Sequence, residues 1–252
     1  MRGFYAVYAG KSIKGSGFMV QKICSWVFVL LAAVCMPDTM HVLPYSSPDE
    51  VEISVSYSGI LEFLDVFANP YYYLDAAEFA QDDELEKIRA AAKEATRGCT
   101  SDYEKIYAVM TYVADSTYYD HLYLEGIEFR SQKAYDVLST HIAICLGYSD
   151  LASAMLRSIG IPCMTATSSS HAYNFAHDGS RWIFFDPTWA SYNTFTVSGE
   201  MLYEGYTDRY FDLESEEIVN LGLSHQTVSI NCGQATATFD WESHTAVMTV
   251  SK

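Results

Sequence analysis

Positively charged residues are scarce in this chain of 252 residues. It has 15 Lys and Arg against 32 Asp and Glu, which gives a formal net charge of −17. Four of the basic residues precede residue 36, where no acid occurs, so 11 basic residues face all 32 acids in the remainder. A protein that binds nucleic acid needs basic residues to neutralise phosphates, so nucleic acid is not an expected partner.

Other patterns are missing too. The sequence has no internal repeats and no low-complexity runs, and no regularly spaced acids form a calcium-binding loop. Apolar residues make up 50% of the chain and aromatic residues 15%, which excludes a disordered protein. The chain is therefore long and apolar enough to bury one sizeable core.

Long apolar runs are also lacking. The one candidate, residues 23–35, is shorter than a bilayer span but suits the core of a secretory signal. Residues 1–35 are therefore expected to be a signal peptide or membrane anchor, and read from Met19 the segment has the form of an ordinary signal peptide. Two alternatives stay open, an uncleaved membrane anchor and a lipid anchor at Cys35. Each predicts a secreted or cell-surface protein that meets the membrane only through this segment.

The rest of the chain divides by composition into three predicted segments. Residues 36–80 form a strand and loop segment, residues 81–215 the main domain, and residues 216–252 a C-terminal β-hairpin extension. Apolar spacing predicts helices over residues 82–97, 102–116, 131–138 and 145–159, the second capped by Ser101 and Glu104. Short strands are expected at 52–57, 164–167, 172–177 and 182–185, with a turn at 118–120. Helices followed by strands indicate the α+β class.

Three short motifs carry chemistry. Cys145 lies in Ile-Cys-Leu-Gly-Tyr, His171 in His-Ala-Tyr-Asn and Asp186 in Phe-Asp-Pro-Thr-Trp. A thiol, an imidazole and a carboxylate are the three parts of an activated thiol nucleophile. The predicted helix begins at Cys145, where its dipole favours a thiolate and its N–H groups favour an oxyanion.

His171 and Asp186 lie on two neighbouring predicted strands. A turn at Asp178 and Gly179 would place residue 171 opposite residue 186, so that the two side chains meet across the ladder. Gly147 is expected to leave room for a substrate backbone. The substrate pocket candidates are Gly147, Tyr148, Tyr173 and Trp189, the last behind the catalytic side chains.

Together these motifs resemble the transglutaminase-like superfamily of cysteine enzymes, from about Glu84 to Trp189. The resemblance implies a papain-like α+β fold, with N-terminal helices packed on an antiparallel sheet. It also implies Cys145 as nucleophile, His171 as base and Asp186 as the residue that orients His171. Ala143, Ser149 and Tyr173 depart from the usual pattern, and none of them removes a catalytic atom.

The other cysteines do not indicate a disulfide framework. Cys24 and Cys35 lie in the apolar segment, and the site claims Cys145, which leaves three that cannot all pair. Cys163 is expected to be a small buried apolar residue. No metal or cofactor is expected.

The sequence favours a cysteine-dependent enzyme that transfers acyl groups of a protein or peptide substrate through a thioester, most simply a peptidase or amidase. A transglutaminase that cross-links glutamine side chains uses the same three residues. A non-catalytic binding module that retains the fold is the alternative from another class. The sequence does not separate water from an amine as the acceptor.

Overall fold

The computed structural model describes residues 6–8, 11–13, 40–42, 50–56, 59–168, 170–221, 227–232, 235–240 and 245–251. Of the predicted signal peptide or membrane anchor, residues 1–35, the apolar run 23–35 and Met19 lie outside them. The chain forms two compact units, one made of Pro70–Ile218 and one of Met1–Asn69 with Val219–Lys252. In the described ranges no helix is long and apolar enough to cross a membrane.

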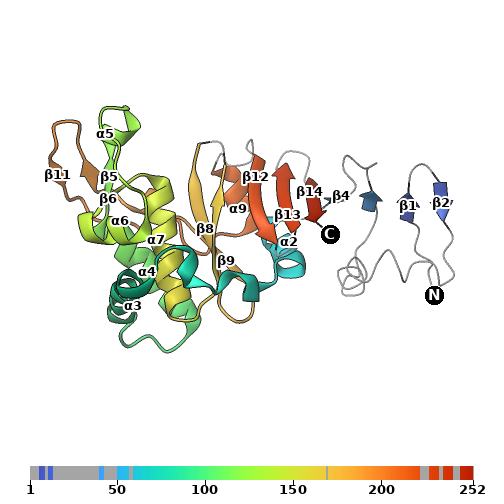
Figure 1. The fold of residues 1–252 in the computed structure, drawn as a ribbon, viewed down its shortest axis with the longest axis horizontal. Coiled ribbons are helices and arrows are strands. Elements are labelled where there is room, and N and C mark those ends of the chain that lie inside the picture. Colours follow the sequence, from blue (N-terminus) through green and yellow to red (C-terminus); the bar gives the residue numbers. More distant parts are fainter. Residues whose placement is uncertain are drawn as a thin grey trace. The chain divides into compact units, whose positions relative to one another are not determined.

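Helices make up one part of the unit Pro70–Ile218. They are η1 (Pro70–Tyr73), η2 (Ala76–Glu78), α3 (Asp82–Ala95), α4 (Asp102–Ser116), α5 (His121–Leu124), α6 (Ala134–Thr140), α7 (Cys145–Ser158), α8 (Pro187–Ala190) and the start of α9 (Ser215–Asn220). Helix α7 contacts α3, α4 and α6 (Figure 1). The predicted capping box of α4 is confirmed, because Ser101 and Glu104 bond to each other's backbone N–H groups.

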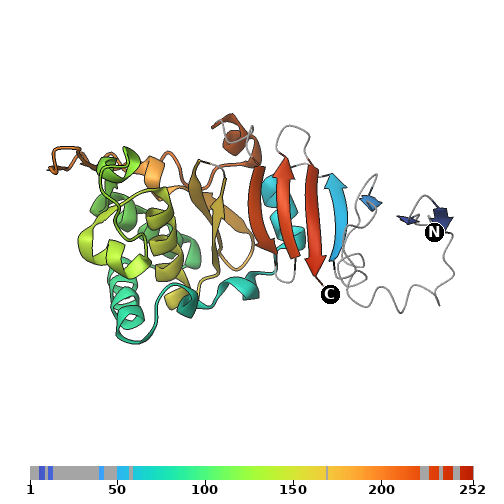
Figure 2. The same cartoon turned by 45° about the horizontal axis from the view of Figure 1, so that its top comes forward.

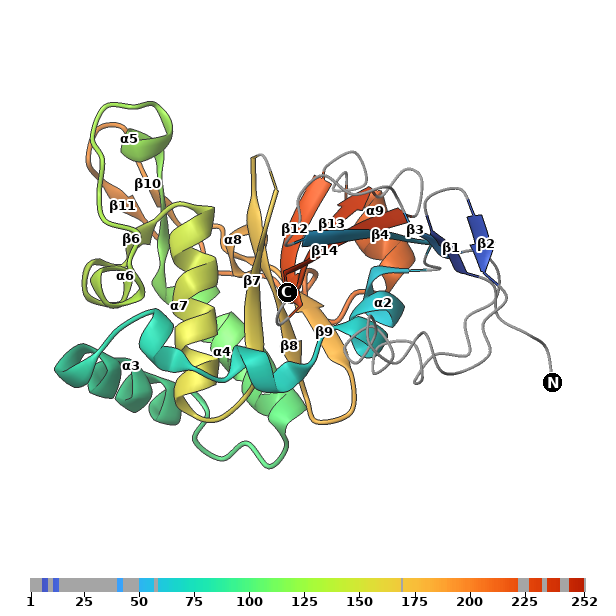
Figure 3. The same cartoon turned by 45° about the vertical axis from the view of Figure 1, so that its right-hand side comes forward.

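Part of a sheet, made of three antiparallel strands, lies beside α7 in the same unit (Figure 3). Its strands are β7 (Cys163–Thr167), β8 (Ala172–His177) and β9 (Trp182–Phe185), in that order. All four residues of β9 are buried, and only the last residue of β8 is not. The core of the unit therefore lies between α7 and this sheet. The predicted α+β class is confirmed.

The turn between β8 and β9 differs from the prediction. The observed register pairs Asn174 with Phe185 and His177 with Trp182, so residues 178–181 form the loop. The carboxylate of Asp178 accepts hydrogen bonds from the backbone N–H groups of Ser180 and Arg181, which makes this loop longer than a two-residue turn. The prediction that residue 171 lies directly opposite residue 186 was therefore wrong.

A second sheet in this unit was not expected. It contains β11 (Met201–Leu202), β10 (Thr194–Phe195), β5 (Tyr118–Asp120) and β6 (Ile142–Ala143), in that order. Strand β5 runs parallel to both β10 and β6. The predicted turn at residues 118–120 was wrong, because partners distant in sequence extend these three residues into a strand.

The other unit contains a run of adjacent antiparallel strands. Its strands, in spatial order, are β3 (Met40–Val42), β4 (Glu50–Ser56), β14 (Thr245–Ser251), β13 (Ala235–Asp240) and β12 (Thr227–Cys232) (Figure 2). Helix α2 (Ile60–Phe67) packs on it through Phe63, whose ring centroid lies 4.7 Å from that of Phe239. The predicted C-terminal hairpin is confirmed as β13 and β14. A separate pair, β1 (Ala6–Tyr8) and β2 (Lys11–Ile13), precedes it in sequence.

Candidate active site

Cys145 is the first residue of α7, as the sequence predicts. The residue before it, Ile144, is extended, and its N–H donates to the side-chain oxygen of Gln132 at 2.9 Å. The N–H of a first helical residue has no acceptor within its own helix, so that of Cys145 is suited to an oxyanion. Gln132 thus fixes the backbone that leads into the nucleophile, a role that no sequence pattern indicates.

The space beside Gly147 is filled. A Cβ atom at this position would lie 2.6 Å from Oε1 of Gln132 and 2.8 Å from Cβ of Ala143. Real Cβ atoms do not approach so closely, so only glycine lets the first turn of α7 pack against these residues. The expectation that Gly147 leaves room for a substrate is corrected, because the protein itself occupies that room.

His171 and Asp186 meet as predicted, although by a different geometry. Nε2 of His171 lies 2.6 Å from Oδ2 of Asp186, and the side chains are 10% and 0% exposed. His171 precedes β8 and Asp186 follows β9, at the same end of the hairpin. Continuing the register by one pair would put Tyr173, not His171, opposite Asp186. The two side chains therefore meet diagonally, which long side chains allow.

Asp186 is held by the segment that follows it. Its Oδ1 accepts hydrogen bonds from the N–H groups of Thr188 and Trp189, both at 3.0 Å, which makes Asp186 the N-cap of α8. Pro187 takes the first helical position, where a missing N–H costs nothing. The Asp-Pro-Thr-Trp motif therefore fixes one carboxylate oxygen on the backbone and leaves the other for His171.

The charge state of His171 depends on both neighbours. Burial alone lowers the pKa of His171, but hydrogen bonds to Asp186 and Cys145, together with their negative charges, raise it to about 9. Because Nε2 bonds to Asp186, Nδ1 is the nitrogen left for the Cys145 thiol. An imidazole beside a thiol is the arrangement that a thiol nucleophile needs.

Trp189 covers one face of His171. The two rings are stacked, with centroids 4.5 Å apart and planes inclined by 11°. Tyr210 packs against Trp189 in turn, with ring centroids 5.7 Å apart. An aromatic face stabilises an adjacent cation, so this stacking favours the protonated imidazole and fixes its plane.

The two tyrosine pocket candidates are inside the protein. Tyr148 and Tyr173 are both 0% exposed. The Tyr148 hydroxyl donates to the carbonyl of Thr117 at 2.7 Å, and burial raises the pKa of Tyr148. Tyr173 packs against Phe175 and Phe184. Both side chains therefore support the site from behind and have no surface for a substrate to contact.

Tyr119, which lies outside the three motifs of the site, is close to the nucleophile. Burial and then the charge of Cys145 raise the pKa of Tyr119. Its ring also packs near those of Tyr148 and His121. No local sequence pattern indicates this position, because residues 118–120 become a strand only through distant partners.

Asn174 links the helix of Cys145 to the strand that follows His171. Its side-chain NH₂ donates to the carbonyl of Ser149 and to the hydroxyl of Ser153, both on α7 and both at 2.9 Å. Asn174 itself is 0% exposed. It is three residues from His171, so its side chain leaves β8 on the opposite face. This spacing from His171 is the one feature of the sequence that indicates the role of Asn174.

Cys163 is buried, as predicted. It is 0% exposed, and burial raises the pKa of its thiol to about 12. Cys99, Cys145 and Cys163 are free thiols. Within the described residues, no group of three or more His, Cys, Asp or Glu side chains is arranged to hold a metal ion.

Residues 89–187 match the family model of the Transglutaminase-like superfamily. This segment contains Cys145, His171 and Asp186 and ends before Trp189. No curated protein matches the chain.

Several solved structures are similar to this chain. A "putative cysteine protease" from Cytophaga hutchinsonii is 15% identical with a TM-score of 0.38, over 85% of this chain and 76% of that protein. A structure described as a TGase is 18% identical with a TM-score of 0.35, over 53% and 37% of the two chains. A "putative protease" from Parabacteroides distasonis is 12% identical with a TM-score of 0.33, over 55% and 31%. The family match confirms the resemblance of this chain to the transglutaminase-like superfamily over residues 89–187.

Proposed function

We propose that this protein is a cysteine-dependent amide hydrolase, a peptidase or amidase, that acts through a thioester on Cys145. The observation that carries the proposal is the contact of His171 with Asp186, in which Nε2 lies 2.6 Å from the carboxylate, together with the influence of Cys145 on the pKa of His171. The match of residues 89–187 to the transglutaminase-like superfamily supports a cysteine enzyme in general terms.

The first half of the reaction forms the thioester. The Cys145 thiolate attacks the amide carbonyl carbon, and the resulting oxyanion is stabilised by the N–H of Cys145 at the start of α7. The bond from carbon to nitrogen then breaks as His171 transfers its proton to the leaving amine. Asp186 stabilises the imidazolium and keeps the ring in place without taking its proton.

The second half releases the acid. Neutral His171 takes a proton from water, which attacks the thioester carbon. The bond from carbon to sulfur breaks, the carboxylic acid leaves and the thiolate returns beside the imidazolium. An amine in place of water would give a new amide, which is the outcome expected of a cross-linking enzyme.

Selective alkylation tests the nucleophile. At neutral pH, iodoacetamide should modify Cys145 far faster than Cys99, a free thiol that is also partly exposed, or the buried Cys163. Mass spectrometry of tryptic peptides gives the rate at each cysteine. In Cys145→Ala the fast modification should vanish while the circular dichroism spectrum stays unchanged. Equal rates at all cysteines would contradict the enzyme and favour a binding module.

The acceptor is tested with a glutamine-containing peptide and a fluorescent amine. Release of ammonia or of a free acid, with no amine incorporated, is expected of the proposed hydrolase. Incorporation of the amine would identify a transglutaminase instead. Cys145→Ala is the control for both readings, since each reaction needs the thiolate.

We also propose that the protein is exported, on the basis of the apolar residues 23–35. Expression of the full chain in bacteria, followed by cell fractionation and mass measurement, tests this. The expected result is protein outside the cytoplasm. Protein of full mass confined to the cytoplasm would contradict export and leave the proposed chemistry untouched.

A further inference from the structure

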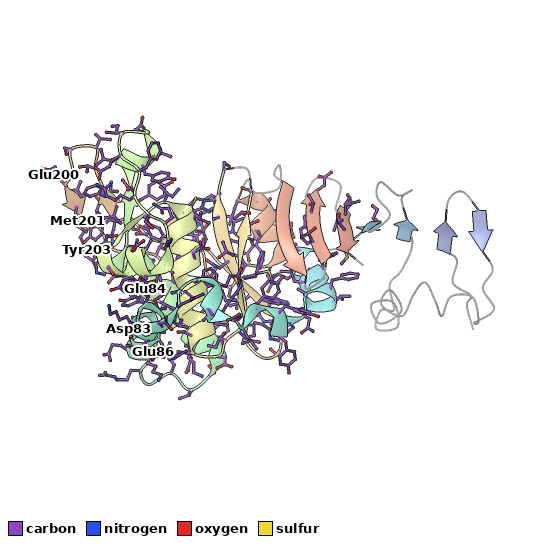
Figure 4. The ribbon with its side chains drawn as sticks, viewed as in Figure 1. Asp83, Glu84, Glu86, Glu200, Met201 and Tyr203 are labelled. Carbon is purple, nitrogen blue, oxygen red and sulfur yellow. The ribbon has the colours of Figure 1, made fainter. Side chains whose placement is uncertain are left out.

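Exposed apolar side chains gather on one hairpin beside the candidate site. We call residues 194–203, which contain β10 and β11, the edge hairpin. Four large apolar residues in it are exposed by 45% to 62%: Val197, Met201, Leu202 and Tyr203. Glu200, Met201 and Tyr203 stand close together on it in Figure 4. Soluble proteins rarely leave such a group uncovered without a use for it.

The hairpin also presents a free strand edge. Strand β11 is the last of its four-stranded sheet within the described residues. The N–H of Thr196 donates to the carbonyl of Glu200, which makes that pair a hydrogen-bonded one. Bonded and non-bonded pairs alternate in an antiparallel ladder, so the next pair, Phe195 and Met201, is non-bonded. The N–H and carbonyl of Met201 therefore point away from β10, where another strand can pair with them.

The sheet joins this edge to the nucleophile. Leu202, Thr194, Tyr119 and Ala143 are successive partners across the four strands. Three strand spacings of about 4.8 Å separate the ends of this row, about 14 Å in all. Two residues after Ala143 comes Cys145, and the charge of Cys145 acts on Tyr119 in the same row. A chain added outside β11 lies one spacing farther, about 19 Å from Ala143, which an extended chain of about six residues spans.

The charge of the edge hairpin and its flanking residues indicates which kind of partner it favours. Residues 191–208 contain three acids, Glu200, Glu204 and Asp208, and no Lys, Arg or His, although Arg209 follows them. All three acids are exposed. Arg130, which stacks on Phe195 of the hairpin, is already paired with Asp120 and Glu128. An acidic, apolar surface complements a partner that carries basic as well as apolar side chains. The exposed aliphatic residues favour a polypeptide over a ligand that only stacks on aromatic rings.

We propose that the outer edge of β11 binds an extended segment of the polypeptide substrate as an added strand, with apolar side chains on the hairpin and basic ones beside Glu200 and Glu204. This inference rests on the proposed function, because it gives the substrate class of the same site. Pairing with the backbone at Met201 provides affinity, and the apolar and acidic side chains provide selectivity.

A binding experiment with the inactive Cys145→Ala protein tests this. The probe is a fluorescein-labelled ten-residue peptide in which Leu and Phe alternate with Lys, followed by fluorescence anisotropy. Two matched peptides carry Glu in place of Lys, or N-methyl groups on alternate amides. Each should bind at least about tenfold more weakly, since the first loses charge attraction and the second loses the strand hydrogen bonds.

Variants of the protein locate the binding. Met201→Pro removes the outward N–H at a position where an edge strand tolerates proline, and should weaken binding about tenfold. Glu200→Lys with Glu204→Lys should reverse the preference for Lys over Glu. Tyr71→Lys, at a side chain that is 80% exposed on η1, is the control and should leave binding unchanged. The methylated peptide gives the same information without altering the fold.

Several results would overturn the proposal. Equal binding of methylated and unmethylated peptides would exclude strand addition, and equal binding to Met201→Pro would exclude this edge. Dimerisation in sedimentation that Met201→Pro abolishes would show that a second copy occupies it. Selective alkylation of Cys145 with no peptide binding would refute docking and leave the hydrolase standing. Peptide binding without selective alkylation would support docking and refute the hydrolase.

Discussion

Two cysteine thiols lie at helix α7, Cys145 at its first residue and Cys163 on the neighbouring strand β7, and their environments differ in opposite ways. At the first residue of the helix, Cys145 is partly exposed and contributes to the raised pKa of His171. Deeper along the helix, the hydroxyl of Ser153 lies 3.4 Å from the sulfur of Cys163, which is 0% exposed. Burial raises the pKa of Cys163 to about 12, so this thiol stays protonated and inert. Solvent access and an imidazole partner, rather than the residue type, separate a nucleophile from a packing residue.

Two carboxylates in the same two regions show a similar contrast. Asp186, at the site, accepts two backbone N–H groups and pairs with His171. Asp150, on the middle part of α7, accepts one hydrogen bond from the hydroxyl of Thr165. Burial raises the pKa of Asp150 to about 6. The site supplies donors for a negative charge, whereas the middle of the helix supplies few.

Removing the charge of Asp186 should have the largest effect. Asp186→Asn keeps an acceptor for Thr188 and Trp189 but no longer stabilises the His171 cation. Turnover should fall by about 10⁴, the loss seen when the orienting carboxylate of a triad is neutralised. Steady-state kinetics on a glutamine-containing peptide measures the fall.

Asp178→Asn is the matched control for that variant. Asp178 also accepts two backbone N–H groups, at the other end of the same hairpin, but has no histidine partner. Its substitution should leave turnover per folded molecule unchanged. If Asp186→Asn were as active as Asp178→Asn, the role of Asp186 in the triad would be wrong.

The raised pKa of His171 should appear as a smaller, pH-dependent effect. Protonated His171 attracts iodoacetate, which is negative, but not neutral iodoacetamide. The ratio of the two alkylation rates at Cys145 should therefore fall about fivefold as the pH rises through about 9. In Asp186→Asn the fall should occur at lower pH, because one cause of the raised pKa is gone. A ratio that stays flat between pH 7 and 10 would contradict the ion pair.

The same shift has a consequence for stability. A histidine whose pKa is raised on folding binds its proton more tightly in the folded state. The stabilisation by the pair is therefore fully present below about pH 6.5 and is lost as the pH rises through about 9. Denaturation with urea across this range should show lower stability at the alkaline end.

The two regions also differ in how far the sequence predicts them. Periodicity and a cap predict α4 and α7, and three motifs predict the site, because each depends on residues close in sequence. The strand at Tyr118–Asp120 depends on partners at residues 142–143 and 194–195, which no local pattern contains. The exact pairing of β8 with β9 depends on the hydrogen bonds of Asp178 in the loop. The prediction that His171 and Asp186 meet is nevertheless correct, because both residues lie at the same end of the hairpin.

The smallest effect on the site is expected from Asp150→Asn, which tests the buried side of the comparison. The folded protein holds the proton of Asp150 more tightly than the unfolded chain does, since burial raises its pKa from 3.8 to about 6. Stability should therefore fall as the pH rises from about 4 to about 6 and stay lower above that. Asparagine is neutral throughout and still accepts a hydrogen bond from Thr165, so the stability of the variant should not fall with pH in this way. Its free energy of unfolding at pH 7 should be about 1–2 kcal/mol higher. Urea denaturation between pH 4 and 7.5 measures both, with Asp208→Asn, at an exposed acid, as the control.

Turnover should be unchanged, because Asp150 hydrogen-bonds to Thr165 and to no residue of the triad. An unchanged pH profile of stability would show that burial does not control the Asp150 proton. A loss of turnover would show that the two regions of α7 are coupled.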